Sequence, residues 1–165
     1  MKTTLILITA FLAAAALAAP AAAGERVCRG TIGAATVDNL KVPDRASCTL
    51  RGTRVKGTIK VGTGSKLVAN RVRVVGNVQA EGSRRVVVRR GSRVGGSIQV
   101  VKVRRGGAVL GTRVIGDVQF FENRGRIEIR RNRINGNLQC KENKPRPIGG
   151  RNRVGGNKED QCRRL

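Results

Sequence analysis

A seven-residue block that recurs at a nearly fixed interval constrains the fold of this chain more than any other feature. The block reads Arg, aliphatic, any residue, Gly, small polar, aliphatic, Gln at 73–79, 93–99, 113–119 and 133–139, with a fainter copy at 54–60 and a closing one at 153–157. Its glycines are evenly spaced except that the first step is shorter than the rest by one residue: Gly57, Gly76, Gly96, Gly116, Gly136 and Gly156. So regular a period indicates a repeat architecture in which each unit stacks on its neighbours.

Composition separates the two architectures that use units of this length, leucine-rich horseshoes and β-solenoids. The repeat has no Leu-x-x-Leu-x-Leu core and no helix-length segment, and its short Val and Ile stretches are divided by Gly, Asn and Ser. Such stretches suit strands and tight corners. We therefore expect an all-β, single-domain parallel β-solenoid over 24–165, with about 20 residues per coil and six to seven coils.

Residues at matching positions of successive coils should stack at the strand spacing of about 4.8 Å. One inward column is expected to contain Val55, Val74, Val94, Val114, Ile134 and Val154. A second contains Ile59, Val78, Ile98, Val118 and Leu138, and a third contains Val61, Ala80, Val100, Phe120 and Cys140. On the remaining side Leu67, Val109, Ile127 and Ile129 should be buried, while Val86, Val87 and Val88 leave the register open by one residue.

Two further columns have structural interpretations. The repeat glycines and the small polar residues after them should turn a corner, the glycines by adopting positive φ and the polar side chains by bonding to nearby backbone. The outward column of Lys60, Gln79, Gln99, Gln119 and Gln139 could pair amide to amide along the axis.

The four cysteines form two pairs about one coil apart: Cys28 with Cys48, and Cys140 with Cys162. One coil spacing lies within the Cα separation of about 4.4–6.8 Å that a disulfide accepts. Other pairings would join opposite ends of the rod, so we expect one disulfide at each end. Zinc is a poor alternative because the chain has no Cys-x-x-Cys spacing and no His.

Residues 1–23 have the pattern of a cleaved signal peptide: Lys2, an apolar run over 5–17, and small residues before Gly24. The alternative is a membrane anchor, but the run is shorter than the roughly 20 residues that span a bilayer. We expect a secreted or extracytoplasmic protein. Removing Lys2 with this segment changes the formal net charge from +24 to 24 − 1 = +23.

The residues do not support a catalytic site. Without His, the commonest general base and metal ligand is missing, and the ten acidic residues recur at one coil position only as Glu122 and Glu142. A calcium cluster or a pair of carboxylates for glycoside cleavage is therefore not visible. We expect no enzyme activity and no cofactor or metal, and we keep a polysaccharide-active enzyme as a remote alternative.

The arginine that opens each block should form an outward ladder, and it is the candidate polyanion-binding site: Arg54, Arg73, Arg93, Arg113, Arg133 and Arg153. A row of cations suits an acidic polymer or the cell-envelope surface. Arginine doublets elsewhere support the other interpretation, in which charge only keeps the surface soluble and blocks edge pairing. Sequence-specific nucleic-acid binding is not expected, because no aromatic residues are interleaved with the basic ones.

The chain also resembles a group of small secreted bacterial proteins with Gly-Asn-Val-Gln repeats. The likeness is most specific at 136–143, Pro145, Pro147, Gly150, Asn152, Gly156, Gln161 and Cys162. Its stacked Val and Gly pattern is more distantly similar to bactofilins, the polymer-forming bacterial cytoskeletal β-helices. This second resemblance implies a right-handed solenoid and a tendency to self-associate end to end. The predicted export signal and end disulfides depart from bactofilins, which argues against a cytoskeletal role. The leading expectation is thus an exported non-catalytic solenoid with a structural or surface-interaction role, and the alternative is a polyanion-binding module.

Overall fold

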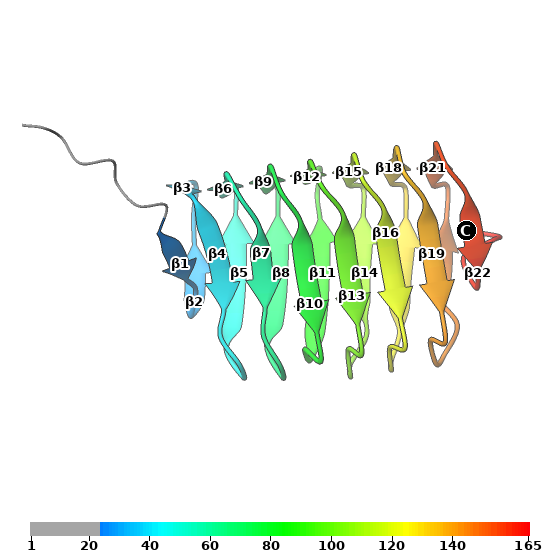
Figure 1. Cartoon of the computed structure of the whole chain (residues 1–165), viewed down its shortest axis with the longest axis horizontal. Helices are drawn as coiled ribbons and strands as arrows, with labels where there is room; N and C mark the ends of the chain where they lie inside the picture. The colour runs from blue at the N-terminus through cyan, green and yellow to red at the C-terminus, as the bar shows by residue number, and fades with distance from the viewer. Residues whose placement is uncertain (1–23) are drawn as a thin grey trace, which may run out of the picture.

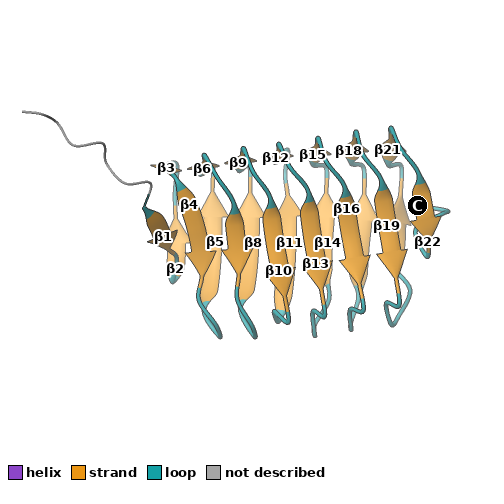
Figure 2. Ribbon diagram, viewed as in Figure 1, coloured by secondary structure: helices purple, strands orange, loops and turns teal. Residues whose placement is uncertain are grey.

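The computed structural model describes residues 24–165, and these residues form a parallel β-solenoid of about seven turns with about 20 residues in each (Figure 1). The predicted signal peptide at 1–23 lies outside the described residues. Each full turn contributes one strand to each of three parallel sheets, which we call A, B and C in the order in which the chain visits them. No helix occurs in the described part of the chain, and no segment of it is therefore a candidate membrane-spanning helix (Figure 2).

Every sheet runs the length of the rod, with each strand paired to its counterparts in the adjacent turns. Sheet A contains β1 (Glu25–Val27), β4 (Asn39–Val42), β7 (Ile59–Val61), β10 (Val78–Glu81), β13 (Ile98–Val101), β16 (Val118–Phe121), β19 (Leu138–Lys141) and β22 (Lys158–Asp160). Sheet B contains β2 (Gly30–Ile32), β5 (Ser47–Arg51), β8 (Lys66–Asn70), β11 (Arg85–Arg89), β14 (Gly107–Leu110), β17 (Ile127–Arg130) and β20 (Ile148–Gly150). Sheet C contains β3 (Thr36–Val37), β6 (Arg54–Val55), β9 (Arg73–Val74), β12 (Arg93–Val94), β15 (Arg113–Val114), β18 (Arg133–Ile134) and β21 (Arg153–Val154).

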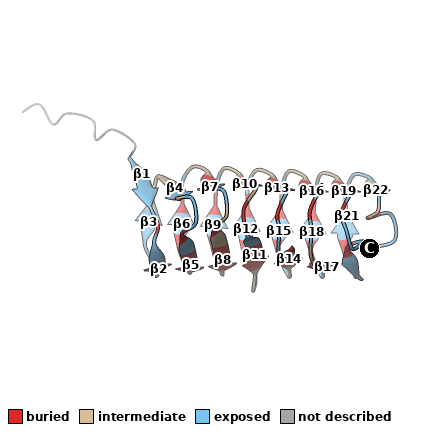
Figure 3. Ribbon diagram, turned by 90° about the horizontal axis from the view of Figure 1, so that it is seen from below, coloured by how far each residue is buried: buried red, intermediate tan, exposed pale blue. Residues whose placement is uncertain are grey.

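The three predicted inward columns are confirmed. Val78 pairs with Ile98 and Ile98 with Val118, and the columns line the buried interior that Figure 3 shows in red. Val154, in the last turn, is only partly buried against the core. The first turn is shorter than the others, because Glu25 already pairs with Asn39. Five strands, β1 to β5, precede the first copy of the block at Arg54, so the solenoid begins more than one turn before the repeat becomes recognisable.

Sheet B settles the register that the three consecutive valines left open. Val86 pairs with Leu67 and Val88 with Ala69, so both point inward and Val87 points outward. The same sheet requires glycine at Gly107 because neighbouring turns approach closely there. A Cβ added at Gly107 would lie 2.7 Å from the carbonyl oxygen of Val86 in the preceding turn, whereas the ring of the fully buried Phe120 would be in ordinary contact at 3.5 Å.

The repeat glycines do turn the corner between sheets C and A, but the predicted positive φ is wrong: none of them adopts it. The structure requires glycine there for space. A Cβ at Gly76 would lie 2.8 Å from the carbonyl oxygen of Gly57 and 2.7 Å from the hydroxyl of Thr58 in the preceding turn. The predicted bonding of the polar residues is confirmed from Thr58 to Asn137, each of which accepts a hydrogen bond from the backbone of the next turn, as when Asn77 Oδ1 accepts from Ser97 N at 2.7 Å.

Side-chain ladders also hold the turns together. The glutamine ladder on the outer face of sheet A is confirmed: Gln79 donates to Gln99, Gln99 to Gln119, and Gln119 to Gln139, at 3.4, 3.0 and 2.7 Å. Two buried asparagine ladders were not anticipated. One, at the corner between sheets A and B, contains Asn123 and Asn143, and the other, at the corner between sheets B and C, contains Asn132 and Asn152.

Both predicted disulfides are present near the ends of the rod. The Cα atoms of Cys28 and Cys48 are 5.6 Å apart, and those of Cys140 and Cys162 are 5.2 Å apart. Leu165, a few residues after the second disulfide, packs against the core. The two bonds indicate an oxidising, extracytoplasmic environment.

Among the described residues, Ser83 has the one buried side-chain polar atom that lacks a hydrogen-bond partner, its hydroxyl oxygen. We expect Ser83→Ala to raise the free energy of unfolding by about 1 kcal/mol, since it removes an unpaired buried polar group. Ser92→Ala is the matched control. The Ser92 hydroxyl donates to Arg89 O at 2.7 Å and accepts from Val72 N at 3.2 Å, so its loss should cost about 2 kcal/mol. Urea denaturation measures both, and destabilisation by Ser83→Ala would contradict the prediction.

Candidate polyanion-binding face

The predicted arginine ladder is brought together on the outer face of sheet C. Each strand of this sheet has two residues, and from β6 to β21 the first is an arginine that points to solvent and the second is an aliphatic residue that points into the core. Arg73 pairs with Arg93 and Arg93 with Arg113, and the row continues without interruption in both directions: Arg54, Arg73, Arg93, Arg113, Arg133 and Arg153. The structure therefore places all six predicted residues in one exposed file.

The positive charges of neighbouring ladder arginines repel one another. Neighbouring unit charges about 4.8 Å apart in water repel by about 0.9 kcal/mol before salt screening. Among residues 24–165 the ion pairs are Lys56 with Asp38, Arg130 with Glu128, and Lys141 with Glu142, so no ladder guanidinium has a carboxylate partner. An external anion would relieve this repulsion, because a guanidinium offers a permanent charge and five donors.

Four more arginines border the ladder, and the sequence interpretation missed them as part of this face. Arg71, Arg90, Arg131 and Arg151 are exposed at the corner where the chain leaves sheet B for sheet C. Three of them stand two residues before a ladder arginine, so an Arg-x-Arg spacing was the signal that could have identified them. We call the ladder and these four corner arginines the arginine face.

Acidic residues are nearly absent from this side of the rod. The column that follows the ladder contains Asp38, Lys56, Val75, Gly95, Ile115, Asn135 and Gly155. Its only acid, Asp38, lies in the first turn and pairs with Lys56 at 3.1 Å. The charge of the arginine face is therefore not balanced by carboxylates along the length of the ladder.

The corner between sheets A and B has a different charge pattern. This corner holds two arginine doublets, Arg84 with Arg85 and Arg104 with Arg105. A hollow at the same corner is lined by acidic as well as basic residues, because Glu122 and Glu142 contribute to it. This corner also carries an exposed basic row in successive turns, formed by Arg84, Arg104, Arg124 and Lys144. The positive residues of the chain are thus spread over more than one side, and the ladder differs from this second row in having no glutamates beside it. This distribution is more specific than the scattered doublets in the sequence suggest.

The arginine face combines permanent positive charge with hydrogen-bond donors, an arrangement that suits anions. The chain contains no His, and no cluster of three or more potential ligands for a metal ion is found within the described range. Comparisons with family models, with curated proteins and with solved structures find no match to this chain. The argument about function therefore depends on the geometry of the face itself.

Proposed function

We propose that this chain is an exported, non-catalytic β-solenoid that binds acidic polymers at the cell envelope or outside the cell through its arginine face. The observation that carries the proposal is the unpaired, in-register arginine file on sheet C. Binding a polyanion releases the counterions that condense on it, which favours association and makes it dependent on salt. The disulfides and the predicted signal peptide support export.

A purely structural solenoid is the second candidate, and the ladders of Gln and Asn that stabilise the rod favour it. In that case the arginines would act through net charge alone, by keeping the surface soluble. The two candidates differ in whether the position of the positive charges matters.

We expect Arg93→Glu combined with Arg113→Glu to weaken binding of a short DNA duplex about 100-fold, because two cations become anions in the middle of the file. The slope of log affinity against log salt should also become shallower by about 2. The matched control, Arg84→Glu with Arg104→Glu, makes the same change in net charge at the corner between sheets A and B. Fluorescence anisotropy across a salt series measures both variants and the mature wild-type protein.

The control should lose no more than about threefold, since the exchanged charges are away from the file. Equal losses in the two variants would show that only net charge matters and would overturn the proposed function. Unchanged thermal unfolding of both variants would show that the solenoid is intact.

A further inference from the structure

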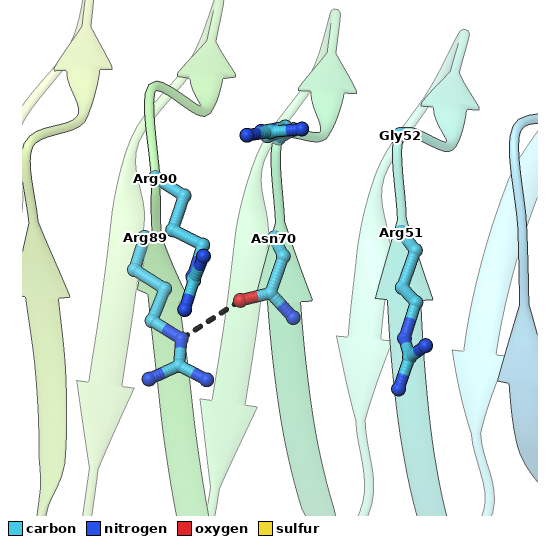
Figure 4. Close-up of a pocket in the computed structure, with 6 residues that line it drawn as sticks. Arg51, Gly52, Asn70, Arg89 and Arg90 are labelled. Atoms are coloured by element: carbon cyan, nitrogen blue, oxygen red, sulfur yellow. Dashed lines mark hydrogen bonds between the residues drawn. The ribbon is translucent and has the colours of Figure 1, made fainter.

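A groove of about 460 Å³ lies where the arginine face meets the end of sheet B. It is lined by Arg51, Gly52, Asn70, Arg71, Arg89 and Arg90, which come from three successive turns (Figure 4). Four of the six lining residues are arginines, and none is acidic.

The groove exists because short residues stand between long ones. Asn70 pairs with Arg51 of the preceding turn and with Arg89 of the following turn, so a short amide separates two long cations. Gly52 adds no side chain at the neighbouring corner position. Two strand spacings separate Arg51 from Arg89, or roughly 9.6 Å between their backbones. That separation is comparable to the width of a tetrahedral oxyanion with one guanidinium on each side.

The Arg89 side chain, on one side of the groove, is held in place before any anion binds. Arg89 Nε donates to Asn70 Oδ1 at 2.7 Å, a bond that Figure 4 shows as a dashed line. The side chain is partly buried, and its two Nη groups are left for another acceptor. A guanidinium that is held in this way loses less freedom when it binds an anion than one that is free in solvent.

The corner residues of the groove have a backbone conformation that favours glycine. Arg71 and Arg90 have φ of 52° and 62°, whereas glycines take up this conformation at other turns of the same corner, as at Gly52 and Gly111. At the corner between sheets A and B, left-handed positions hold Lys102 as well as Glu122 and Glu142, so the conformation does not select the sign of the charge.

At the corner between sheets B and C, by contrast, every non-glycine residue with positive φ is arginine: Arg71, Arg90, Arg131 and Arg151. Positive side chains thus occupy positions where glycine would relieve the backbone, and two of them, Arg71 and Arg90, line the groove.

Further along the rod the same column does not form such a site. Leu110 follows Arg89 in the column, and the next residue, Arg130, pairs with Glu128 at 3.2 Å. The four-arginine groove is therefore a local feature of the N-terminal half of the arginine face.

We infer that this groove is a subsite for one phosphate or sulfate group, carried by the acidic polymer whose remaining charges lie along the ladder. The inference rests on the proposed function, because the polymer is the one that the arginine face binds. Arg51 and Arg89 contact the oxyanion from opposite sides, and Arg71 and Arg90 contact it from the corner.

The test uses the mature protein with ¹⁵N-labelled arginine and follows the Nε–H signals by NMR at constant ionic strength. Inorganic phosphate and sulfate are titrated separately, with sodium chloride as the comparison salt. Both oxyanions should give saturable changes in the Nε–H chemical shifts of Arg51 and Arg89. Ladder residues such as Arg93 should give small, linear shifts. Arg89→Gln should raise the dissociation constant of phosphate at least tenfold, and the matched control Arg130→Gln should change it less than twofold.

Linear shifts at all arginines, or equal effects of Arg89→Gln and Arg130→Gln, would overturn the subsite. Asn70→Leu gives a second route, because it fills the hollow and removes the acceptor of Arg89 without changing the net charge. It should weaken phosphate binding about tenfold, and wild-type affinity in this variant would also count against the subsite.

Two polymer arms distinguish the source of the oxyanion. If Arg89→Gln lowers the affinity of the protein for polyphosphate more than its affinity for heparin, the polymer is phosphorylated. The reverse result identifies a sulfated polymer. If the ladder variant Arg93→Glu with Arg113→Glu loses polymer while Arg89→Gln binds phosphate normally, only the subsite fails. In the opposite case, the ladder variant and its control bind polymer equally while the Arg89 signal still saturates with phosphate. The proposed function then fails, and the inference that a polymer carries the bound oxyanion fails too.

Discussion

Replacing Asn123 with leucine is expected to lower the free energy of unfolding by about 4 kcal/mol, the largest effect that we predict for a single substitution. The Asn123 side chain is fully buried and accepts a hydrogen bond from Val103 N at 2.8 Å. It also donates to Val100 O at 2.9 Å and to Asn143 Oδ1 at 2.8 Å. Leucine would leave the Val103 N–H buried without a partner and would break the ladder between two turns.

The exposed Asn135 provides the matched control. It occupies the column position that Val75 and Ile115 fill in other turns, so Asn135→Leu should change the free energy of unfolding by less than about 0.5 kcal/mol. Urea denaturation of both variants measures the difference. Equal stability of the Asn123 and Asn135 variants would show that the buried ladder does not stabilise the stack.

Gly76→Ala is expected to cost about 3 kcal/mol, because the added methyl group has no free space. Its Cβ would lie 2.8 Å from Gly57 O and 2.9 Å from Gly57 C, which belong to the backbone of the preceding turn. Relief requires the two turns to move apart, and the bond from Gly76 N to Gly57 O at 2.9 Å would be strained. Thermal or urea unfolding provides the measurement.

Gly111→Ala separates the effect of space from that of conformation. Gly111 has φ of 57° but nothing within 4 Å of an added Cβ, so alanine there should cost only about 1 kcal/mol. A larger cost at Gly111 than at Gly76 would mean that backbone conformation, rather than close approach between turns, determines which glycines matter most.

The sequence was sufficient to predict the features that depend on the period alone. Once the repeat is recognised, stacking places Ile98 on Val78, Arg93 on Arg73 and Cys28 near Cys48 without further assumptions. The period-two alternation of strands then determines that Arg93 points outward and Val94 inward.

Features at the corners could not be predicted in the same way, because alternation stops where a strand ends. Asn123 and Asn143 recur one period apart, but their polarity suggests exposure, and only the structure shows that they point inward. The repeat glycines were correctly placed at a corner for the wrong reason, since a sequence does not reveal how closely neighbouring turns approach. The four-arginine groove was missed because it depends on a short residue, Asn70, between long ones in adjacent turns.

The nearly constant offset between paired residues has a consequence for how such a rod can change in size. Pairing partners such as Arg93 and Arg113 are one period apart, so removal or duplication of one complete period would keep every column continuous. The corners absorb single-residue differences, because Val88 pairs with Ala69 and Val109 at offsets of 19 and 21 residues, but a change in length inside a strand would shift aliphatic side chains out of the interior. Rods of this design therefore lengthen in discrete increments of about 4.8 Å, and each increment can add one cation to the file. The length of polymer that the surface can contact is therefore set by the number of periods in the chain.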